Sequence, residues 1–170
     1  TYQPSQWLIP KNENTDKVGN YSFQFDGTLD YIDCGDITAF NGATEISCFC
    51  WINIGSLATN DGIMVKWDYA TQGCIGIQTD ASSSDELQVF VADSLTDGGF
   101  NHTSTTDANL SVDTWYHIGF VYDGSLAAAD RIKIYVDGND KTTSVTGTIA
   151  TSLTTATSTF KIAKFGGTLP

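Results

Sequence analysis

Basic residues are scarce in this chain: eight Lys and Arg stand against twenty Asp and Glu, a net charge of −12 over 170 residues. A field of this sign repels nucleic acid and anionic lipid, so we expect neither as a partner. No apolar run is long enough to span a membrane, and no signal peptide stands at the first residue. Membrane insertion is therefore not expected either.

Glutamate and histidine are also rare, which limits the catalytic chemistry that the sequence can support. The three glutamates, Glu13, Glu45 and Glu86, have no second acid at i+2 or i+4 on a strand face. Glycoside cleavage needs two carboxylates about 5–10 Å apart, so this pattern does not support it. The histidines His102 and His117 accompany no G-x-S-x-G nucleophile elbow. We predict that the chain is not an enzyme.

The four cysteines contain no C-x-x-C pair, which argues against zinc ribbons and thioredoxin-type redox chemistry. Two interpretations stay open. In the first interpretation, all four are small buried apolar residues of a chain made in a reducing cytosol. Alternatively, Cys34 or Cys74 forms a disulfide with the strand that carries Cys48 and Cys50.

The residues that are abundant favour strands and turns. Apolar residues make up 41% of the chain, glycine is plentiful, and no stretch of strong helix formers occurs. Short strand patterns recur between clusters of Asp, Gly, Ser, Thr and Asn, at residues 21–25, 31–34, 46–54, 62–67, 73–79, 86–92, 115–123, 131–138 and 159–165. They predict an all-β fold, an antiparallel two-sheet β-sandwich. We expect a lead-in segment over 1–20 and one domain over 21–170.

Three segments allow more specific predictions. The strand at 46–54 is apolar on both faces, with Phe49 and Trp51 on the second face, so we expect a central strand covered on both sides. The segment 131–139 alternates, so we expect Ile132, Ile134 and Val136 to face the core, and its Asp-Gly-Asn sequence at 137–139 predicts a two-residue hairpin with positive φ angles. The Thr- and Ser-rich stretch 142–159 predicts a long loop or an edge strand.

The segment "YSFQFDGTLDYIDCGD", residues 21–36, predicts a hairpin whose turn is flanked by Asp26 and Asp30. Calcium binds six to eight hard oxygens, mostly carboxylates and carbonyls, and these two aspartates could supply part of such a shell. The alternative is that Asp26 accepts hydrogen bonds from turn amides while Asp30 is solvated.

Two aromatic segments are candidates for ligand contact, because binding sites combine apolar lining with a few placed polar groups. The first offers Trp67, Asp68 and Tyr69 at the end of a strand. The second offers Phe100, Asn101 and His102. In the alternative interpretation Trp67 packs at the edge of the core and Tyr69 is a surface turn residue.

Four motifs in order carry a resemblance: the opening "YSFQFDGTLDYIDCGD", then "NGATEISCFCWI", "DTWYHIGFVYDG" and "RIKIYVDGN". Over residues 21–165 the chain resembles the laminin-G-like, concanavalin-A-like lectin/glucanase superfamily. The "WLIPKN" lead-in gives it a looser resemblance to domains of phage virion and tail proteins. The glucanase E-x-D-x-x-E strand is absent. So is the closing G-x-I-D-E strand, whose Asp can contribute to the ion site of calcium-binding relatives. Either the chain is cut short or another segment or subunit fills that gap.

The resemblance implies a jelly-roll sandwich and a lectin-type function. We expect a non-enzymatic module that binds carbohydrate for adhesion, with a glycan on a cell surface as partner, possible help from calcium, and an extracellular or virion-surface location. The rival interpretation is a structural virion protein, a capsid decoration or fibre module that contacts only other protein subunits, including copies of itself. A glycoside hydrolase is the third alternative.

Overall fold

The computed structural model describes residues 22–57, 60–67, 73–80, 85–92, 100–105 and 108–164. Within these ranges the chain forms a 3-10 turn and eleven strands, whose bounds are β1 Ile32–Asp33, η2 Thr38–Phe40, β2 Glu45–Asn53, β3 Gly62–Lys66, β4 Ile75–Thr79, β5 Leu87–Ala92, β6 Phe100–Thr105, β7 Trp115–Asp123, β8 Ile132–Val136, β9 Asn139–Asp140, β10 Thr142–Thr146 and β11 Phe160–Ile162. No helix in these ranges has the length and apolar character of a membrane span. The predicted boundary after residue 20 lies outside them and stays a prediction.

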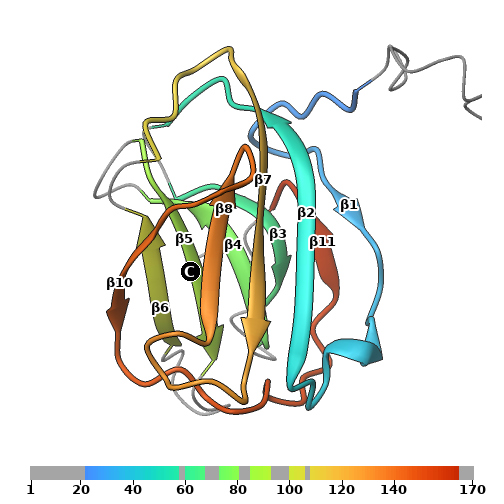
Figure 1. The fold of residues 1–170 in the computed structure, drawn as a ribbon. Coiled ribbons are helices and arrows are strands. Elements are labelled where there is room, and N and C mark those ends of the chain that lie inside the picture. Colours follow the sequence, from blue (N-terminus) through green and yellow to red (C-terminus); the bar gives the residue numbers. More distant parts are fainter. Residues whose placement is uncertain are drawn as a thin grey trace, which may run out of the picture.

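Two antiparallel sheets pack face to face, as the sequence predicted (Figure 1). The large sheet has seven strands in the order β1-β11-β3-β4-β5-β6-β10. The small sheet has four, in the order β2-β7-β8-β9. Since consecutive strands are often not neighbours, the sandwich depends on contacts between segments that are far apart in the sequence.

The core lies between the sheets and is built by the period-2 alternation of their strands. From the small sheet, β7 contributes Ile118 and Phe120 and β8 contributes Ile132 and Ile134, all at most 1% exposed. Side chains of β3, β4 and β5 in the large sheet complete this cluster. The expected inward side of β8 is thereby confirmed.

The strand at 46–54 is not the central strand that its sequence predicted. As β2 it is an edge strand of the small sheet, and Phe49 and Trp51 are 44% and 60% exposed. The strands buried on both faces are instead β4 and β5 of the large sheet. The apolar residues on both faces of this strand predicted that both faces are buried. In the structure, one of the two faces carries exposed aromatic rings.

The hairpin prediction at residues 137–139 is confirmed. Strands β8 and β9 pair with Val136 opposite Asn139, so the loop contains only Asp137 and Gly138. Both have positive φ, 49° and 79°, as a two-residue hairpin loop of type I′ requires. The predicted edge strand within 142–159 is also present, as β10 at the edge of the large sheet.

The predicted opening hairpin does not form among the described residues, because 22–30 contain no strand. Instead β1 pairs with β11, with Ile32 opposite Ile162. The strand that pairs with β1 thus comes from near the other end of the chain. Local alternation of residues cannot reveal so distant a partner. The strand β6 was missed as well, because its Thr-, Ser- and Asn-rich sequence resembles a loop.

None of the four cysteines forms a disulfide. Cys74 is buried and its Sγ donates to the Thr154 carbonyl at 2.9 Å, whereas Cys48 and Cys50 are half-buried on the inner face of β2. Cys34 is exposed, so the expectation that all four are buried is wrong for this residue.

The Lys66 side chain fastens the segments after β1 and before β11 to the large sheet. The Lys66 ammonium group, fully buried at the end of β3, donates to the Asp36 carboxylate. It also donates to the carbonyls of Ala156 and Ser158, at 3.2 and 2.7 Å. A buried ammonium needs such partners, since an unpaired one costs several kcal/mol.

Candidate functional site

Aromatic side chains gather on the outer face of the small sheet. Alternation along β2 turns Phe49 and Trp51 outward, and the neighbouring strand β7 begins with Trp115, which is 51% exposed. Two further rings lie on the same face, from β7 and β8. We call these five side chains the aromatic face: Phe49, Trp51, Trp115, His117 and Tyr135.

A glycine makes room for the ring at the centre of this face. Gly119 lies directly opposite Phe49 in the ladder of β2 and β7. A Cβ at Gly119 would lie 2.3 Å from Phe49 Cδ1, so the ring rests against the bare glycine backbone. From there it reaches His117 in a stacked contact, with centroids 5.7 Å apart, and Tyr135 at 6.1 Å. Aromatic pairs at these separations stabilise each other.

The second half of the face is organised by the backbone of β7. Trp51 stands opposite His117, and their rings are 5.2 Å apart at an angle of 44°. The His117 amide donates to Asp137 Oδ1 at 2.9 Å, which ties β7 to the loop between β8 and β9. The strand β7, which carries Trp115 and His117, is therefore hydrogen-bonded to neighbouring segments on both sides.

This arrangement suits a ligand with both apolar and polar surface. A contiguous exposed apolar patch on a single domain commonly marks an interaction site. Polar groups stand among the rings, namely the Tyr135 hydroxyl, the His117 imidazole and, two positions along β8 from Tyr135, the Lys133 ammonium group. Rings with a few polar partners can hold a sugar by its C–H face and its hydroxyls.

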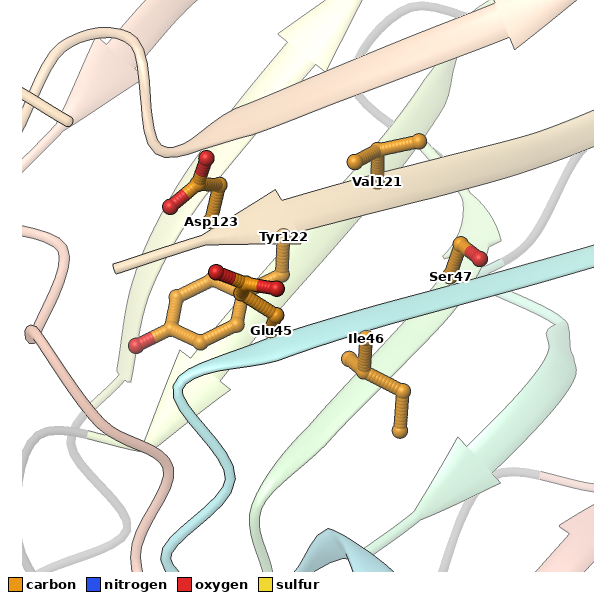
Figure 2. A pocket seen from close by; sticks show the side chains of 6 residues that line it. All are labelled: Glu45, Ile46, Ser47, Val121, Tyr122 and Asp123. Atoms are coloured by element: carbon orange, nitrogen blue, oxygen red, sulfur yellow. The ribbon is translucent and has the colours of Figure 1, made fainter. Parts of the chain in front are cut away.

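A pocket lies at the other end of the same two strands, where β2 begins and β7 ends (Figure 2). Its residues are Glu45, Ile46, Ser47, Val121, Tyr122 and Asp123. Glu45 and Asp123 stand directly opposite each other across the ladder. The pocket thus contains two carboxylates that the sequence alone did not bring together.

The pair of Glu45 and Asp123 does not resemble the acid pair of a glycosidase. The amide and hydroxyl of Ser125 donate to Asp123 Oδ1 at 2.9 and 2.6 Å and lower the pKa of its carboxyl. Glu45 is exposed to solvent. A general acid at neutral pH needs a buried carboxyl with a raised pKa, whereas the pKa of Asp123 is lowered and Glu45 is not buried.

The first predicted aromatic segment is only partly described. Trp67 is 1% exposed and packs edge-on against Phe90, with centroids 5.7 Å apart. Its ring is therefore part of a small apolar cluster of the large sheet, as the alternative interpretation expected. Asp68 and Tyr69 lie outside the described residues, and their role in binding stays a prediction.

The second predicted segment lies in strand β6. Phe100 pairs with Ala92, and its side chain lies outside the description. The Asn101 amide nitrogen donates to the Thr148 carbonyl at 2.8 Å. His102 is opposite Phe90, the residue that contacts Trp67, so His102 and Trp67 share one face of the sheet while Asn101 points to the other.

The two candidate calcium ligands lie in a tight turn. Asp26 Oδ1 accepts the amides of Thr28, Leu29 and Asp30 at 2.8, 2.8 and 3.0 Å, and these hydrogen bonds hold its pKa well below the usual value. In the described part of the chain, no three His, Cys, Asp or Glu residues converge as metal ligands. This turn alone offers fewer oxygens than calcium needs. Calcium binding by Asp26 and Asp30 therefore stays a prediction.

Sequence reasoning missed the aromatic face, although its signal was present. Phe49 and Trp51 alternate with inward residues, and Trp115 and His117 do the same. These patterns indicate which residues share a face, but not whether that face is covered. The exposure of Phe49, Trp51 and Trp115 shows that no described element covers this face.

The comparison with family models agrees with this fold. Residues 26–167 match the family model described as the concanavalin A-like lectin/glucanases superfamily. A solved structure of a native heptameric SAP-like pentraxin from Limulus polyphemus matches with 14% identity and a TM-score of 0.40. The match covers 75% of this chain and 57% of the pentraxin, so the chain spans little more than half of its length. No curated protein matches. The chain belongs to the concanavalin A-like lectin/glucanase superfamily.

Proposed function

We propose that this chain is a non-enzymatic binding module that holds carbohydrate on the aromatic face. The observation that carries the proposal is the exposure of Phe49, Trp51 and Trp115, which are 44%, 60% and 51% exposed on one side of a single sheet. Aromatic rings cost free energy when water surrounds them, so a cluster of this kind favours a ligand that covers it.

Charge and shape favour a sugar over the other common ligands. The net charge of −12 repels anionic polymers. The chain has only eight Lys and Arg residues with which to form the basic groove that nucleic acid requires. A strand ladder spreads its outward side chains over a broad surface. Such a surface fits a chain of sugar rings, each with its apolar C–H face on an aromatic ring.

The proposed setting is the outside of a cell or a virion. A glycan on a cell surface is the proposed partner, and adhesion is the proposed role, in a phage virion or tail protein or in a secreted adhesin. Binding by one such face is weak, and repetition of the module in an assembly would raise the overall affinity. Calcium is not required by this proposal, since the aromatic face contains no carboxylate.

The test is binding to a glycan array, with calcium and again with EDTA, for the wild-type chain and for Trp51→Ala and Trp115→Ala. We expect binding that survives EDTA and falls at least tenfold in both variants. Phe23→Ala is the matched control, because Phe23 is an exposed aromatic residue, 79% exposed, in the segment before β1. Equal binding by all four proteins would place the ligand elsewhere. Loss of binding in EDTA would restore Asp26 and Asp30 as ligand candidates.

The rival function is a structural protein that contacts only other protein subunits, and one observation favours it. The edge strand β2 has a pairing partner on one side only among the described strands. An obligate oligomer in solution without affinity for any glycan would support this alternative. A monomer that binds sugar would exclude it.

A further inference from the structure

Two exposed carboxylates border the aromatic face at the β8–β9 hairpin. Asp137 comes directly after β8, and its Oδ1 accepts the His117 amide at 2.9 Å, so this carboxylate lies beside the strand that carries the His117 ring. Asp140 on β9 is directly opposite Tyr135, and residues so paired project to the same side of the sheet. Both aspartates are exposed. The rings of His117 and Tyr135 therefore have carboxylates as neighbours.

Two further carboxylates lie on the same side of the small sheet, toward the pocket. Glu45 comes four positions before Phe49 on β2, and Asp123 comes four positions after Gly119 on β7. Because alternation has a period of two, both side chains share the outer side with the rings. Figure 2 shows Asp123 on the opposite side of the strands from the inward residue Ile46. The rings thus have acidic groups at two of their borders.

The basic groups of this side do not neutralise these carboxylates. The Arg131 guanidinium donates to three backbone carbonyls, those of Gly124, Leu126 and Ile149. Lys133 has two aspartates as neighbours, since it pairs with Asp130 at 3.4 Å and also interacts electrostatically with Asp140. The outer side of the small sheet is therefore acidic, as is the whole chain with its net charge of −12.

The exposed tryptophans add a second attraction for positive charge. The face of a Trp ring attracts a cation more strongly than the face of Tyr or Phe. Trp51 and Trp115 are 60% and 51% exposed. Trp51 is opposite His117, two positions from Trp115, so the two indoles are diagonal neighbours in the ladder. A ligand that spans both rings can place a cation over either of them.

A neutral ligand would gain less from this surface than a cationic one. Any ligand that covers the rings also removes water from the neighbouring carboxylates of Asp137 and Asp140. A charge that loses water and gains no partner costs free energy. A positive group on the ligand offsets this cost, whereas an anionic ligand is repelled. The charge of the surface therefore favours a cationic ligand among those that can stack on aromatic rings.

We propose that the aromatic face selects a glycan whose sugars carry protonated amino groups, such as a chain of glucosamine, over the same glycan with acetylated amines. This inference rests on the carbohydrate-binding function proposed above and names the class of sugar. The sugar rings lie on Trp51 and Trp115, and the ammonium groups lie over an indole or beside Asp137 and Asp140.

The first test compares two ligands that differ only in their amino groups. They are a tetramer of glucosamine and the same tetramer with every amine acetylated. Both are titrated calorimetrically into the wild-type chain at a pH at which the free amines are protonated. We expect the free amines to bind at least about tenfold more tightly, because each ammonium group gains ring or carboxylate contacts. Equal affinities, or tighter binding of the acetylated tetramer, would overturn the inference.

A double variant tests the carboxylates. Asp137→Asn with Asp140→Asn removes two charges, while each amide oxygen can still accept the hydrogen bond that the carboxylate accepts. We expect the preference for free amines to fall about three- to tenfold, and the affinity for the acetylated tetramer to stay. The matched control is Asp33→Asn with Asp85→Asn, which removes two exposed charges at the large sheet. A similar fall in both double variants would contradict the proposed contacts.

Non-specific adsorption of a cationic sugar by the acidic chain is separated by the tryptophans. Trp51→Ala and Trp115→Ala leave the net charge unchanged, so adsorption by charge alone would be the same in both. We expect each to weaken binding of the free-amine tetramer about fivefold or more, and the control Phe23→Ala to leave it unchanged. Unchanged affinity in both tryptophan variants would overturn the inference.

The outcomes also separate this inference from the function on which it rests. If the aromatic face binds neutral glycans as tightly as amino sugars, carbohydrate binding stands and selection by charge is wrong. If neither tetramer binds and no glycan on the array binds, both are wrong. A preference for free amines that shrinks as the salt concentration rises would support the inference, since exposed charges are screened by salt.

Discussion

The ring of Phe49 rests on the bare backbone of Gly119, its direct neighbour on the adjacent strand. A single missing side chain on β7 thus allows an aromatic side chain on β2 to lie flat and to reach both His117 and Tyr135. The aromatic face is therefore built from side chains of three strands.

A side chain at Gly119 should disrupt this arrangement. In Gly119→Ala the new Cβ would meet Phe49 Cδ1 and the Cys48 carbonyl oxygen, so the ring and the ladder must shift. We expect the free energy of unfolding to fall by about 1–3 kcal/mol, measured by urea denaturation. Gly55→Ala is the control, since a Cβ there meets nothing within 4 Å. Equal effects of the two substitutions would contradict the packing described here.

The ion pair of the buried Lys66 should matter more than the exposed pair of Lys133. Asp36→Asn leaves the Lys66 ammonium group buried without its counter-charge, and we expect a loss of about 2–4 kcal/mol in the free energy of unfolding. Asp130→Asn removes the partner of Lys133 at the surface and should cost less than about 1 kcal/mol. Similar losses in both variants would show that burial does not strengthen the first pair.

The turn at Asp26 should contribute to stability in a way that depends on pH. Its amide hydrogen bonds lower the pKa of the folded carboxyl below the ordinary value of 3.8. The contribution is therefore present above pH 3.8 and is lost as the pH falls toward the folded pKa. In Asp26→Asn the amide oxygen still accepts the hydrogen bonds but does not titrate. Urea denaturation from pH 7 to pH 2.5 should show the gap between the two proteins shrinking below pH 3.8, and a constant gap would refute this.

The thiols should react at different rates. Burial raises the pKa of Cys50 to about 11, so about one molecule in a thousand carries its thiolate at pH 8. Cys34 is exposed and should be modified first by a thiol reagent, as mass spectrometry of the labelled peptides can show. In urea all four thiols should react together. A Cys50 that reacts as fast as Cys34 in the folded protein would mean that the edge of β2 opens readily.

Local signals were reliable where both partners of an interaction are near in sequence. The loop of Asp137 and Gly138 followed from residue types that tolerate positive φ, and the alternation of β8 correctly indicated its inward side. The same reasoning failed for β1, because its partner Ile162 comes from the other end of the chain. The cluster around Trp67 is likewise formed across neighbouring strands, so the local sequence did not decide between its two interpretations.

The sequence by itself determined the class of fold, because the strand periodicity, the turn residues and the ordered motifs are local properties of the chain. It also determined that Phe49 and Trp51 share one face of their strand. The tertiary structure alone decided that this strand is at an edge, that its outer face is open, and that Glu45 meets Asp123. Strand order is set by how the whole core packs, and no single segment contains that information.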